Sequence, residues 1–184
     1  MNRTKFIKKK MFGRILDVGC EAGELHKIIK SDNFYGLDLK PKKYKEKTVK
    51  ADAEKMPFSN DCFDTIIAGE LIEHLPNPQN FLKESERTLK KNGIIIITTP
   101  NKKSWVNRAL KSSFHKGHIS LFDISEIKKS VGKYFSIEEF FCLPYDEISS
   151  WGSRHKKMFW VRKLTHHFLP KGLQENIIIL GRKK

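Results

Sequence analysis

Two glutamates and a histidine that lie close together in the sequence are the residues best suited to chemistry in this chain. Glu70, Glu73 and His74 fall in the stretch GELIEHLPNP, residues 69–78, which follows an apolar run and contains two prolines. The spacings i,i+3 and i,i+4 place all three side chains on one face if residues 70–75 form a helical turn. Two carboxylates and an imidazole on one face are able to hold a divalent metal ion, with open positions for the oxygens of a substrate.

A fourth ligand for such an ion has to come from another part of the chain. The segment FHKGHISLF, residues 114–122, offers His115 and His118 downstream of an isoleucine-rich run. The candidate metal ligands, which are also the candidate catalytic residues, are Glu70, Glu73, His74 and His118. Without a metal, His74 could act as a general base or contact the substrate, and Glu70 could bind backbone N–H groups. A structural role for the stretch, and for His118, also stays open.

A glycine turn lies near the start of the chain. In ILDVGCEAGEL, residues 15–25, Asp17, Gly19 and Gly23 follow the spacing D-x-G-x-x-x-G. Glycines let the backbone approach a ligand closely, and the helix expected after the turn offers free N–H groups. A dinucleotide fingerprint reads G-x-G-x-x-G, but here Glu21 stands at the middle glycine position, where its carboxylate would repel a pyrophosphate. The turn therefore favours a cofactor without phosphates, including one that carries a positive charge.

Acidic residues end the next two expected strands. Asp38 lies in the apolar run 34–39, and Asp52 follows the strand-like stretch that begins at residue 48. An acid at the end of the second strand is able to accept hydrogen bonds from both hydroxyls of a ribose. Asp52 with Ala53 is placed to bind an adenine amino group. Acids at three successive strand ends, next to a glycine turn, form a far more specific set than any one of them alone.

These residues require a sheet whose strands end at a common edge. Apolar runs that we expect to form strands alternate with stretches of helical periodicity. The expected strands are 12–18, 34–39, 48–52, 62–69, 93–100, 136–143 and 176–182. The expected helices are 22–31, 80–93 with Gly93 as C-cap, and 124–135 with Asp123 or Ser125 as N-cap. This order predicts a single α/β domain over residues 1–184, with a doubly wound, Rossmann-like sheet that is mostly parallel and has a C-terminal antiparallel strand.

The motifs resemble those of the class I S-adenosylmethionine-dependent methyltransferases of the type 11 or type 23 kind. ILDVGCEAG is similar to the first motif of that family, GLDL to the second, KADAEKMPFSNDCFDTIIAGELIEHL to the third and fourth, and LKKNGIIIITTPN to the fifth. The likeness covers about residues 12–100. E-x-x-E-H, followed by TPN and a downstream histidine, resembles two metal-using branches: the O-methyltransferases of quinone biosynthesis and the small-RNA 3′-terminal 2′-O-methyltransferases.

The resemblance implies an enzyme that binds S-adenosylmethionine and releases S-adenosylhomocysteine. It assigns the ribose to Asp38, the adenine to Asp52 and Ala53, and the cofactor's amino group, or the shape of the turn, to Asp17. The full set of cofactor residues that it implies is Asp17, Gly19, Cys20, Gly23, Asp38, Leu39, Asp52 and Ala53. In the metal-using branches, Mg²⁺ or another divalent ion lowers the pKa of the accepting hydroxyl.

The composition fits a globular domain with a strongly basic surface. The chain has 184 residues, of which 39% are hydrophobic and 31% charged, and its formal net charge is +15. No apolar run approaches the ~20 residues that span a bilayer. Cys20, Cys62 and Cys142 lie far apart, so we expect a reducing, cytoplasmic location, with peripheral attachment to a membrane also open. The lysine excess favours an anionic partner, either an acidic membrane surface or RNA.

Two less regular segments, about 101–122 and 145–170, are expected to form the substrate side of the domain. Aromatic and basic residues alternate over 151–172, a pattern that suits a lid, a membrane interface or a nucleic-acid contact. Because the first expected strand begins near residue 12, we expect any cover over the site to come from these segments or from a partner.

Three functions are compatible with these patterns. The first is methylation of an oxygen of a small or lipid-like molecule. The second is metal-dependent 2′-O-methylation of RNA, which the net charge favours and the lack of a recognisable RNA-binding module disfavours. The third is a non-catalytic subunit that binds S-adenosylmethionine and supports a partner protein.

Overall fold

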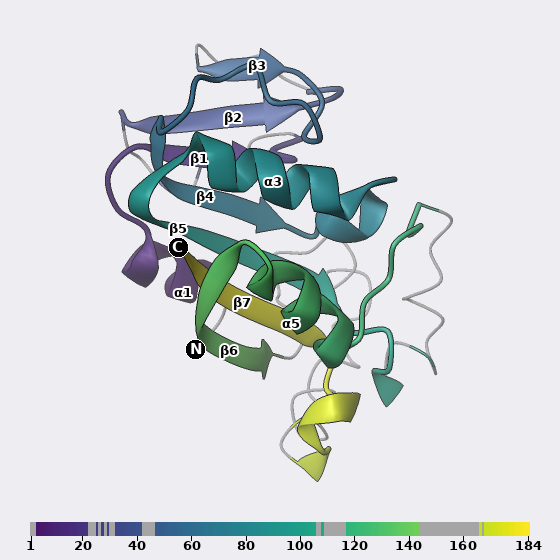
Figure 1. Ribbon diagram of the computed structural model, residues 1–184. Coiled ribbons are helices and arrows are strands. Elements are labelled where there is room, and N and C mark those ends of the chain that lie inside the picture. Colours follow the sequence, from purple (N-terminus) through teal and green to yellow (C-terminus); the bar gives the residue numbers. More distant parts are fainter. Residues whose placement is uncertain are drawn as a thin grey trace.

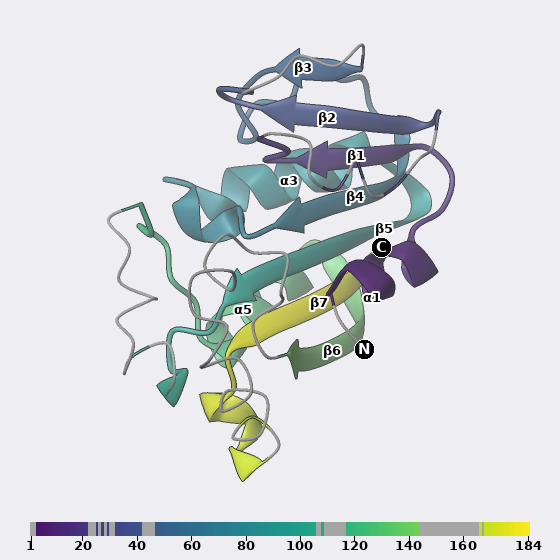
Figure 2. The same ribbon diagram turned by 180° about the vertical axis from the view of Figure 1, so that it is seen from behind.

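The computed structural model folds into one sheet with helices on both faces (Figures 1 and 2). It describes residues 3–21, 25, 27, 29, 32–41, 47–105, 108, 117–143, 166 and 168–184. The strands are β1 (Ile15–Val18), β2 (Phe34–Asp38), β3 (Thr48–Lys50), β4 (Phe63–Gly69), β5 (Leu89–Pro100), β6 (Phe135–Leu143) and β7 (Asn176–Lys183). The helices are α1 (Arg3–Lys10), α3 (Pro78–Thr88) and α5 (Ile124–Gly132), with 3₁₀ turns η1 (Ile72–His74) and η3 (Lys171–Leu173).

The strand order is β3-β2-β1-β4-β5-β7-β6. The first five strands run parallel, and β7 runs antiparallel to both β5 and β6. The structure therefore confirms the predicted α/β class, with a mostly parallel sheet and an antiparallel C-terminal strand. The parallel strands end on the same side of the molecule (Figure 1), which we call the carboxyl edge.

Two apolar layers hold the helices against the sheet. Phe81 and Leu82 of α3 and Ile127 of α5 belong to one buried cluster, and both helices lie on the same face (Figure 1). Phe6 and Ile7 of α1 belong to a second cluster on the other face (Figure 2). With both faces covered, the central strands can be apolar on both sides, which explains the isoleucine-rich sequence of β5. Among the described residues, no helix has the length and apolarity needed to cross a bilayer.

The predicted cap of α5 is present, whereas the predicted cap of α3 is wrong. Asp123 accepts a hydrogen bond from the backbone N–H of Glu126 (2.9 Å), and the Glu126 carboxylate accepts one from the N–H of Asp123 (2.8 Å), which completes a capping box. In contrast, α3 ends at Thr88, because Leu89 already pairs with Phe63 as the start of β5. Gly93 lies within that strand, where an added Cβ would approach the carbonyl oxygen of Lys90 to 2.9 Å.

The N-terminal region differs from the expectation. Helix α1 was not predicted, and the first strand begins at Ile15 rather than at residue 12. Gly13 has a φ of 62°, and the N–H of Arg14 donates to the Asp64 carboxylate at 2.7 Å, so the chain turns here before it enters the sheet. Most of the helix predicted over 22–31, and most of the segment 145–170, lie outside the described residues.

Candidate functional site

The glycine turn follows β1 at the carboxyl edge. Gly19 has a φ of 76°, and an added Cβ would lie 2.9 Å from the Cδ1 of Leu71. The backbone conformation and the close contact both require glycine at this position. The N–H of Gly19 donates to the carbonyl oxygen of Leu37 at 2.7 Å, which ties the turn to β2. Gly23, the second predicted glycine of the turn, lies outside the described residues.

The predicted ribose and adenine residues lie beside this turn at the ends of β2 and β3. The two Asp38 carboxylate oxygens accept hydrogen bonds from the N–H groups of Glu21 (2.8 Å) and Lys40 (2.7 Å). The Asp52 carboxylate accepts one from the N–H of Glu54 at 2.8 Å. Both acids are thus oriented by backbone donors before any ligand is bound. Ala53 is buried next to Asp52, and Leu39 is exposed next to Asp38.

Cys20 lies within the turn and packs inward. A Cβ added at Gly36 would lie 2.8 Å from the Cys20 sulfur, so the thiol fills the space above this glycine of β2. Burial raises the pKa of Cys20 to about 12, with a further contribution from the charges of Asp17 and Asp38. Cys20 therefore stays a neutral thiol, which suits a packing role in the turn rather than nucleophilic chemistry.

Asp17 is a buried acid at the centre of the site. Burial raises the pKa of Asp17 to about 7; the positive charge of Arg3 opposes this rise and the charge of Asp38 adds to it. The side chain of Arg3 reaches the carboxyl edge from α1, where it also forms a 3.7 Å ion pair with Glu70. A cationic group of a ligand near Asp17 would favour the ionised carboxylate, as Arg3 does.

Replacing Asp17 with Asn is expected to flatten the pH dependence of stability between about pH 4 and pH 7. The folded pKa of about 7 exceeds the ordinary value of 3.8. The stability that the protonated form provides is therefore complete below about pH 4 and is lost as the pH rises through about 7. Asn is neutral throughout, so that loss disappears. Denaturant titrations at a series of pH values measure the slope.

The matched control is Glu84→Gln, for which the opposite sign is expected. A hydrogen bond from the Arg87 side chain lowers the pKa of Glu84. The stability from this pair is present above the ordinary carboxylate pKa and is lost as the pH falls through the lowered value. An Asp17→Asn variant with the same pH slope as the unchanged protein would contradict the assignment of a raised pKa to Asp17.

Glu70 lies at the end of β4 but is directed toward α1 and β5. Its backbone has a φ of 54°, and its N–H donates to the carbonyl oxygen of Thr98 at 2.9 Å. Its carboxylate accepts a hydrogen bond from the Thr98 hydroxyl at 3.1 Å and faces Arg3. Burial raises the pKa of Glu70, while Arg3, Thr98 and His74 act against the rise. Glu70 is thus held by neighbours on β5 and α1.

Glu73 is fully buried in η1. One carboxylate oxygen, Oε2, accepts a hydrogen bond from the Thr99 hydroxyl at 2.9 Å. The other, Oε1, has no hydrogen-bond partner among the described residues. Burial, and then the negative charge of Glu70, raises the pKa of Glu73 well above its ordinary value. A buried carboxylate oxygen without a donor is costly unless a proton or a cation meets it.

The segment that carries His118 folds back onto η1. The N–H groups of Ile119 and Ser120 both donate to the carbonyl oxygen of Glu73 at 2.9 Å. The Nδ1 of His74 lies 2.7 Å from the carbonyl oxygen of Gly117, so Nδ1 carries the proton and donates it. This bond leaves the lone pair on Nε2 of His74 available as a ligand or a base.

Three of the four predicted ligands meet at this point. The ligand atoms of Glu73, His74 and His118 all lie within 4.8 Å of one another, and the two imidazole rings stand edge to face with centroids 4.7 Å apart. Glu70 stays outside this triad, because the helical turn covers only Ile72–His74 and the left-handed backbone of Glu70 directs its side chain elsewhere. His115 lies outside the described residues.

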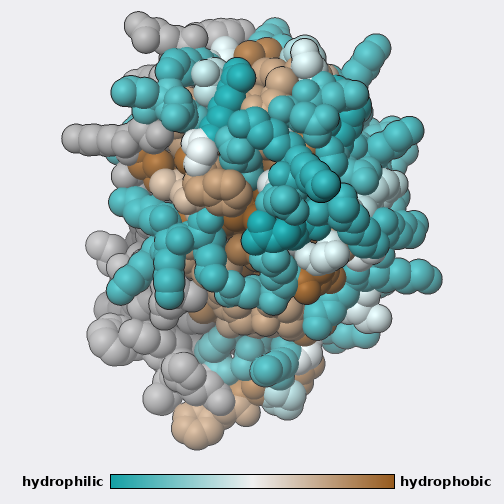
Figure 3. Space-filling model, turned by 60° about the vertical axis from the view of Figure 1, so that its left-hand side comes forward, coloured by the Kyte–Doolittle hydropathy of each residue, from teal (hydrophilic) through white to brown (hydrophobic). Residues whose placement is uncertain are grey.

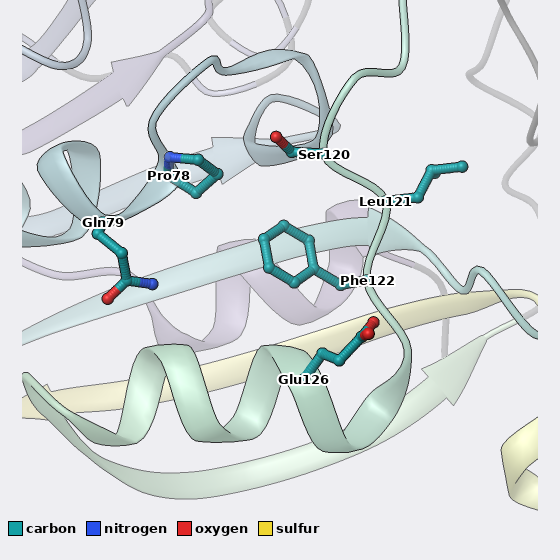
Figure 4. Close-up of a pocket in the computed structure, with 6 residues that line it drawn as sticks. All are labelled: Pro78, Gln79, Ser120, Leu121, Phe122 and Glu126. Carbon is teal, nitrogen blue, oxygen red and sulfur yellow. The ribbon is translucent and has the colours of Figure 1, made fainter.

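An open pocket of about 370 Å³ lies on the face of the sheet that α3 and α5 cover. Figure 4 shows Phe122 pointing into the space between the N-terminal ends of these helices. The residues that line the pocket are Pro78, Gln79, Ser120, Leu121, Phe122 and Glu126. None of the predicted site residues lines it, although Ser120 connects it to η1 through its hydrogen bond to Glu73.

The central part of the sequence matches a known family. Residues 16–97 match a family model described as a methyltransferase domain. The match runs from β1 into β5 and therefore spans the glycine turn, the acids at the ends of β2 and β3, and η1. The part of the chain that carries the candidate site is therefore similar to a methyltransferase domain.

Individual proteins are also similar to this chain. An uncharacterized protein of Methanocaldococcus jannaschii is 33% identical over 119 residues, or 62% of this chain and 52% of that protein. A ubiquinone biosynthesis O-methyltransferase of Dechloromonas aromatica is 30% identical over 107 residues, 48% of this chain and 45% of that protein. The chain thus spans about half the length of these curated relatives. A solved SAM-dependent methyltransferase from Archaeoglobus fulgidus, 20% identical, has the same fold with a TM-score of 0.70, covering 98% of this chain and 92% of that one.

Three residues of the candidate site were not found from the sequence. Thr98 and Thr99 at the end of β5 hold Glu70 and Glu73, and Arg3 lies among the acids. The adjacent threonines could have been found, because they end a strand expected next to β4 and lie at the carboxyl edge. Arg3 had no such signal, since α1 is a short lysine-rich helix whose position depends on Phe6 and Ile7 in the core.

Proposed function

We propose that this protein transfers a methyl group from S-adenosylmethionine to a hydroxyl oxygen of a small or lipid-like molecule. The observation that carries the proposal is the meeting of Glu73, His74 and His118 at the carboxyl edge. This triad lies next to the glycine turn, because Leu71, just before η1, is the residue that contacts Gly19. The relatives described as ubiquinone biosynthesis O-methyltransferases support an oxygen acceptor.

The triad fits a divalent ion of the first transition row. Two imidazoles with one carboxylate suit ions such as Zn²⁺ or Fe²⁺, whereas Mg²⁺ prefers oxygen ligands. Glu73 provides a buried oxygen that lacks a donor among the described residues. The hydrogen bond from His74 to the carbonyl oxygen of Gly117 is the kind of outer contact that ligating histidines usually make. His118 would complete the set.

The chemistry divides between the ion and the side chains. A divalent ion held by Glu73, His74 and His118 would lower the pKa of the acceptor hydroxyl. Asp38 would hold the ribose and Asp17 the ammonium group, so that the methyl group faces the acceptor. The acceptor O–H loses its proton to solvent, the C–S bond of the cofactor breaks as the O–C bond forms, and S-adenosylhomocysteine leaves.

A metal-free version of the same reaction rests on His74. Its exposed ring keeps the Nε2 lone pair free, because Nδ1 is bound to Gly117. Nε2 could take the proton of the acceptor hydroxyl directly, as a general base. The two versions differ in their need for a metal, which the next experiment measures.

Methyl transfer from S-adenosylmethionine to catechol-like acceptors is expected to fall about a hundredfold or more after treatment with EDTA, because the acceptor hydroxyl then keeps its ordinary pKa. Re-addition of Zn²⁺ or Co²⁺ is expected to restore activity better than Mg²⁺. Transfer of radioactive methyl groups measures the rate, with an RNA oligonucleotide as a parallel acceptor. Activity that is insensitive to EDTA but lost in His74→Gln would replace the metal mechanism with the general-base version. Methylation of the RNA alone would overturn the small-molecule acceptor.

A further inference from the structure

Large apolar side chains are exposed at the carboxyl edge of the sheet. Trp105 is 59% exposed, Ile119 60%, Phe168 83% and Leu173 38%. Single exposed apolar residues are common on soluble domains, but several at one edge mark an interaction surface. These four come from the segments that follow β5 and precede β7.

Asn101 ties these segments together. Its side-chain amide donates to the carbonyl oxygens of Gly172 (2.9 Å) and Gln174 (2.8 Å), and its backbone pairs with Phe122 in an isolated bridge. In both Figures 1 and 2 the yellow segment that carries η3 projects beyond the point where β5 ends and β7 begins. The segments joined in this way are 101–105, 117–122 and 168–174. The exposed apolar residues therefore lie on segments that are hydrogen-bonded to one another through Asn101.

Among the described residues, the positive charge of these segments comes from Arg108 and Lys171, because Lys102 and Lys103 form ion pairs with Glu126 (3.4 Å) and Asp123 (2.7 Å). Residues 101–105, 108, 117–122 and 168–174 include no aspartate or glutamate. The basic residues in them are Lys102, Lys103, Arg108 and Lys171. Arg108 and Lys171 are exposed. Together with the net charge of +15, this favours a negatively charged partner.

We propose that this surface binds a lipid bilayer that contains anionic lipids. The docking surface, as we call it, consists of Trp105, Ile119, Phe168, Leu173, Arg108 and Lys171. Tryptophan and phenylalanine insert at the level of the headgroups, while arginine and lysine bind lipid phosphates. A bilayer fits better than a nucleic acid, because Ile119 and Leu173 have no ring on which a base could stack.

The docking surface reaches the candidate site directly. Ile119 follows His118, and its N–H donates to the carbonyl oxygen of Glu73. Docking would therefore bring the triad to the membrane surface, from which a lipid-like acceptor comes; this last step rests on the proposed function. The face in Figure 3, turned toward the side where the parallel strands begin, is instead mostly hydrophilic, with small hydrophobic areas between polar side chains.

Co-sedimentation with vesicles tests the docking. The protein is expected to bind vesicles of phosphatidylcholine with phosphatidylglycerol, and to stay in solution with phosphatidylcholine alone. The double variant Phe168→Ser/Leu173→Ser is expected to bind vesicles at least about tenfold more weakly, since two inserted apolar groups are lost. The control is Phe12→Ser, an exposed aromatic at the opposite edge, which should bind normally. A second pair of variants tests the contribution of positive charge to vesicle binding. Lys171→Glu should weaken binding, while Lys91→Glu, at an exposed lysine of β5 outside the docking surface, should change it much less.

The outcomes separate the docking surface from the proposed function. Vesicle binding needs neither cofactor nor acceptor, so a lack of methyl transfer would leave it standing. Variants of the docking surface should keep their affinity for S-adenosylhomocysteine in calorimetry. Equal losses in Phe12→Ser and the double variant would overturn the docking surface. Steeply salt-dependent binding to RNA, with no binding to anionic vesicles, would assign the positive charge to nucleic acid instead.

Discussion

The Glu73→Gln variant is expected to bind Zn²⁺ or Co²⁺ at least about a hundredfold more weakly and to lose methyl transfer to the same degree, because a metal ligand is removed. The glutamine amide still accepts the hydrogen bond of Thr99, so the shape of η1 should be kept. Calorimetric titration of the metal into protein freed of metal by EDTA measures the affinity.

The stability of this variant separates a lost ligand from a lost fold. Glu73 is buried and its pKa is raised well above the ordinary value, so the ionised carboxylate reduces stability as the pH rises through that raised pKa. Glutamine is neutral at every pH. The free energy of unfolding of Glu73→Gln in metal-free buffer above neutral pH should therefore equal or exceed that of the unchanged protein.

The matched control is Glu70→Gln, which makes the same chemical change three positions earlier in the chain. Glu70 faces Arg3 and Thr98 and stays outside the triad, so its substitution should leave most of the metal affinity intact. Equal losses in the two variants would mean that both glutamates bind the ion, as the E-x-x-E-H spacing predicts. No metal affinity in the unchanged protein would leave only the general-base role of His74.

The Asp38→Ala variant is expected to bind S-adenosylhomocysteine at least about a hundredfold more weakly than the unchanged protein. Two hydrogen bonds from ribose hydroxyls to an ionised carboxylate contribute about 1.5–3 kcal/mol each, and every 1.4 kcal/mol is about a factor of ten in affinity. The carboxylate is already oriented by the N–H groups of Glu21 and Lys40, which limits the entropy lost on binding. Isothermal titration calorimetry measures the dissociation constant.

Two further variants define the origin of this loss. Asp38→Asn keeps one acceptor oxygen and the size of the side chain, so an intermediate affinity is expected. Asp32→Ala removes an exposed acid before the start of β2, far from the carboxyl edge, and should bind the cofactor normally. An Asp38→Ala variant with unchanged affinity and an unchanged melting temperature would remove Asp38 from the cofactor site.

Local chemistry explains which elements were predicted correctly. Apolar runs bounded by turns identified β2, β4, β6 and β7 to within a residue or two. Burial on both faces explains the runs of β4 and β7, whereas β6 is a partly buried edge strand. The capping box at Asp123 and Glu126 is equally local, since both partners lie in one helical turn. The Gly93 cap failed because the pairing of Leu89 with Phe63, a contact distant in sequence, ended α3 earlier than its periodicity predicts.

The sequence by itself determined the α/β fold, the glycine turn and the acids at successive strand ends, because strand periodicity, turn conformation and the succession of elements along the chain are encoded by neighbouring residues. Only the tertiary structure decided which glutamate joins the histidines. Glu70 and Glu73 have the same chemistry, and the spacing E-x-x-E-H treats them alike. Arg3 comes from α1 and His118 from a segment bound to the backbone of Glu73, so long-range packing turns one carboxylate toward α1 and leaves the other facing the two imidazoles.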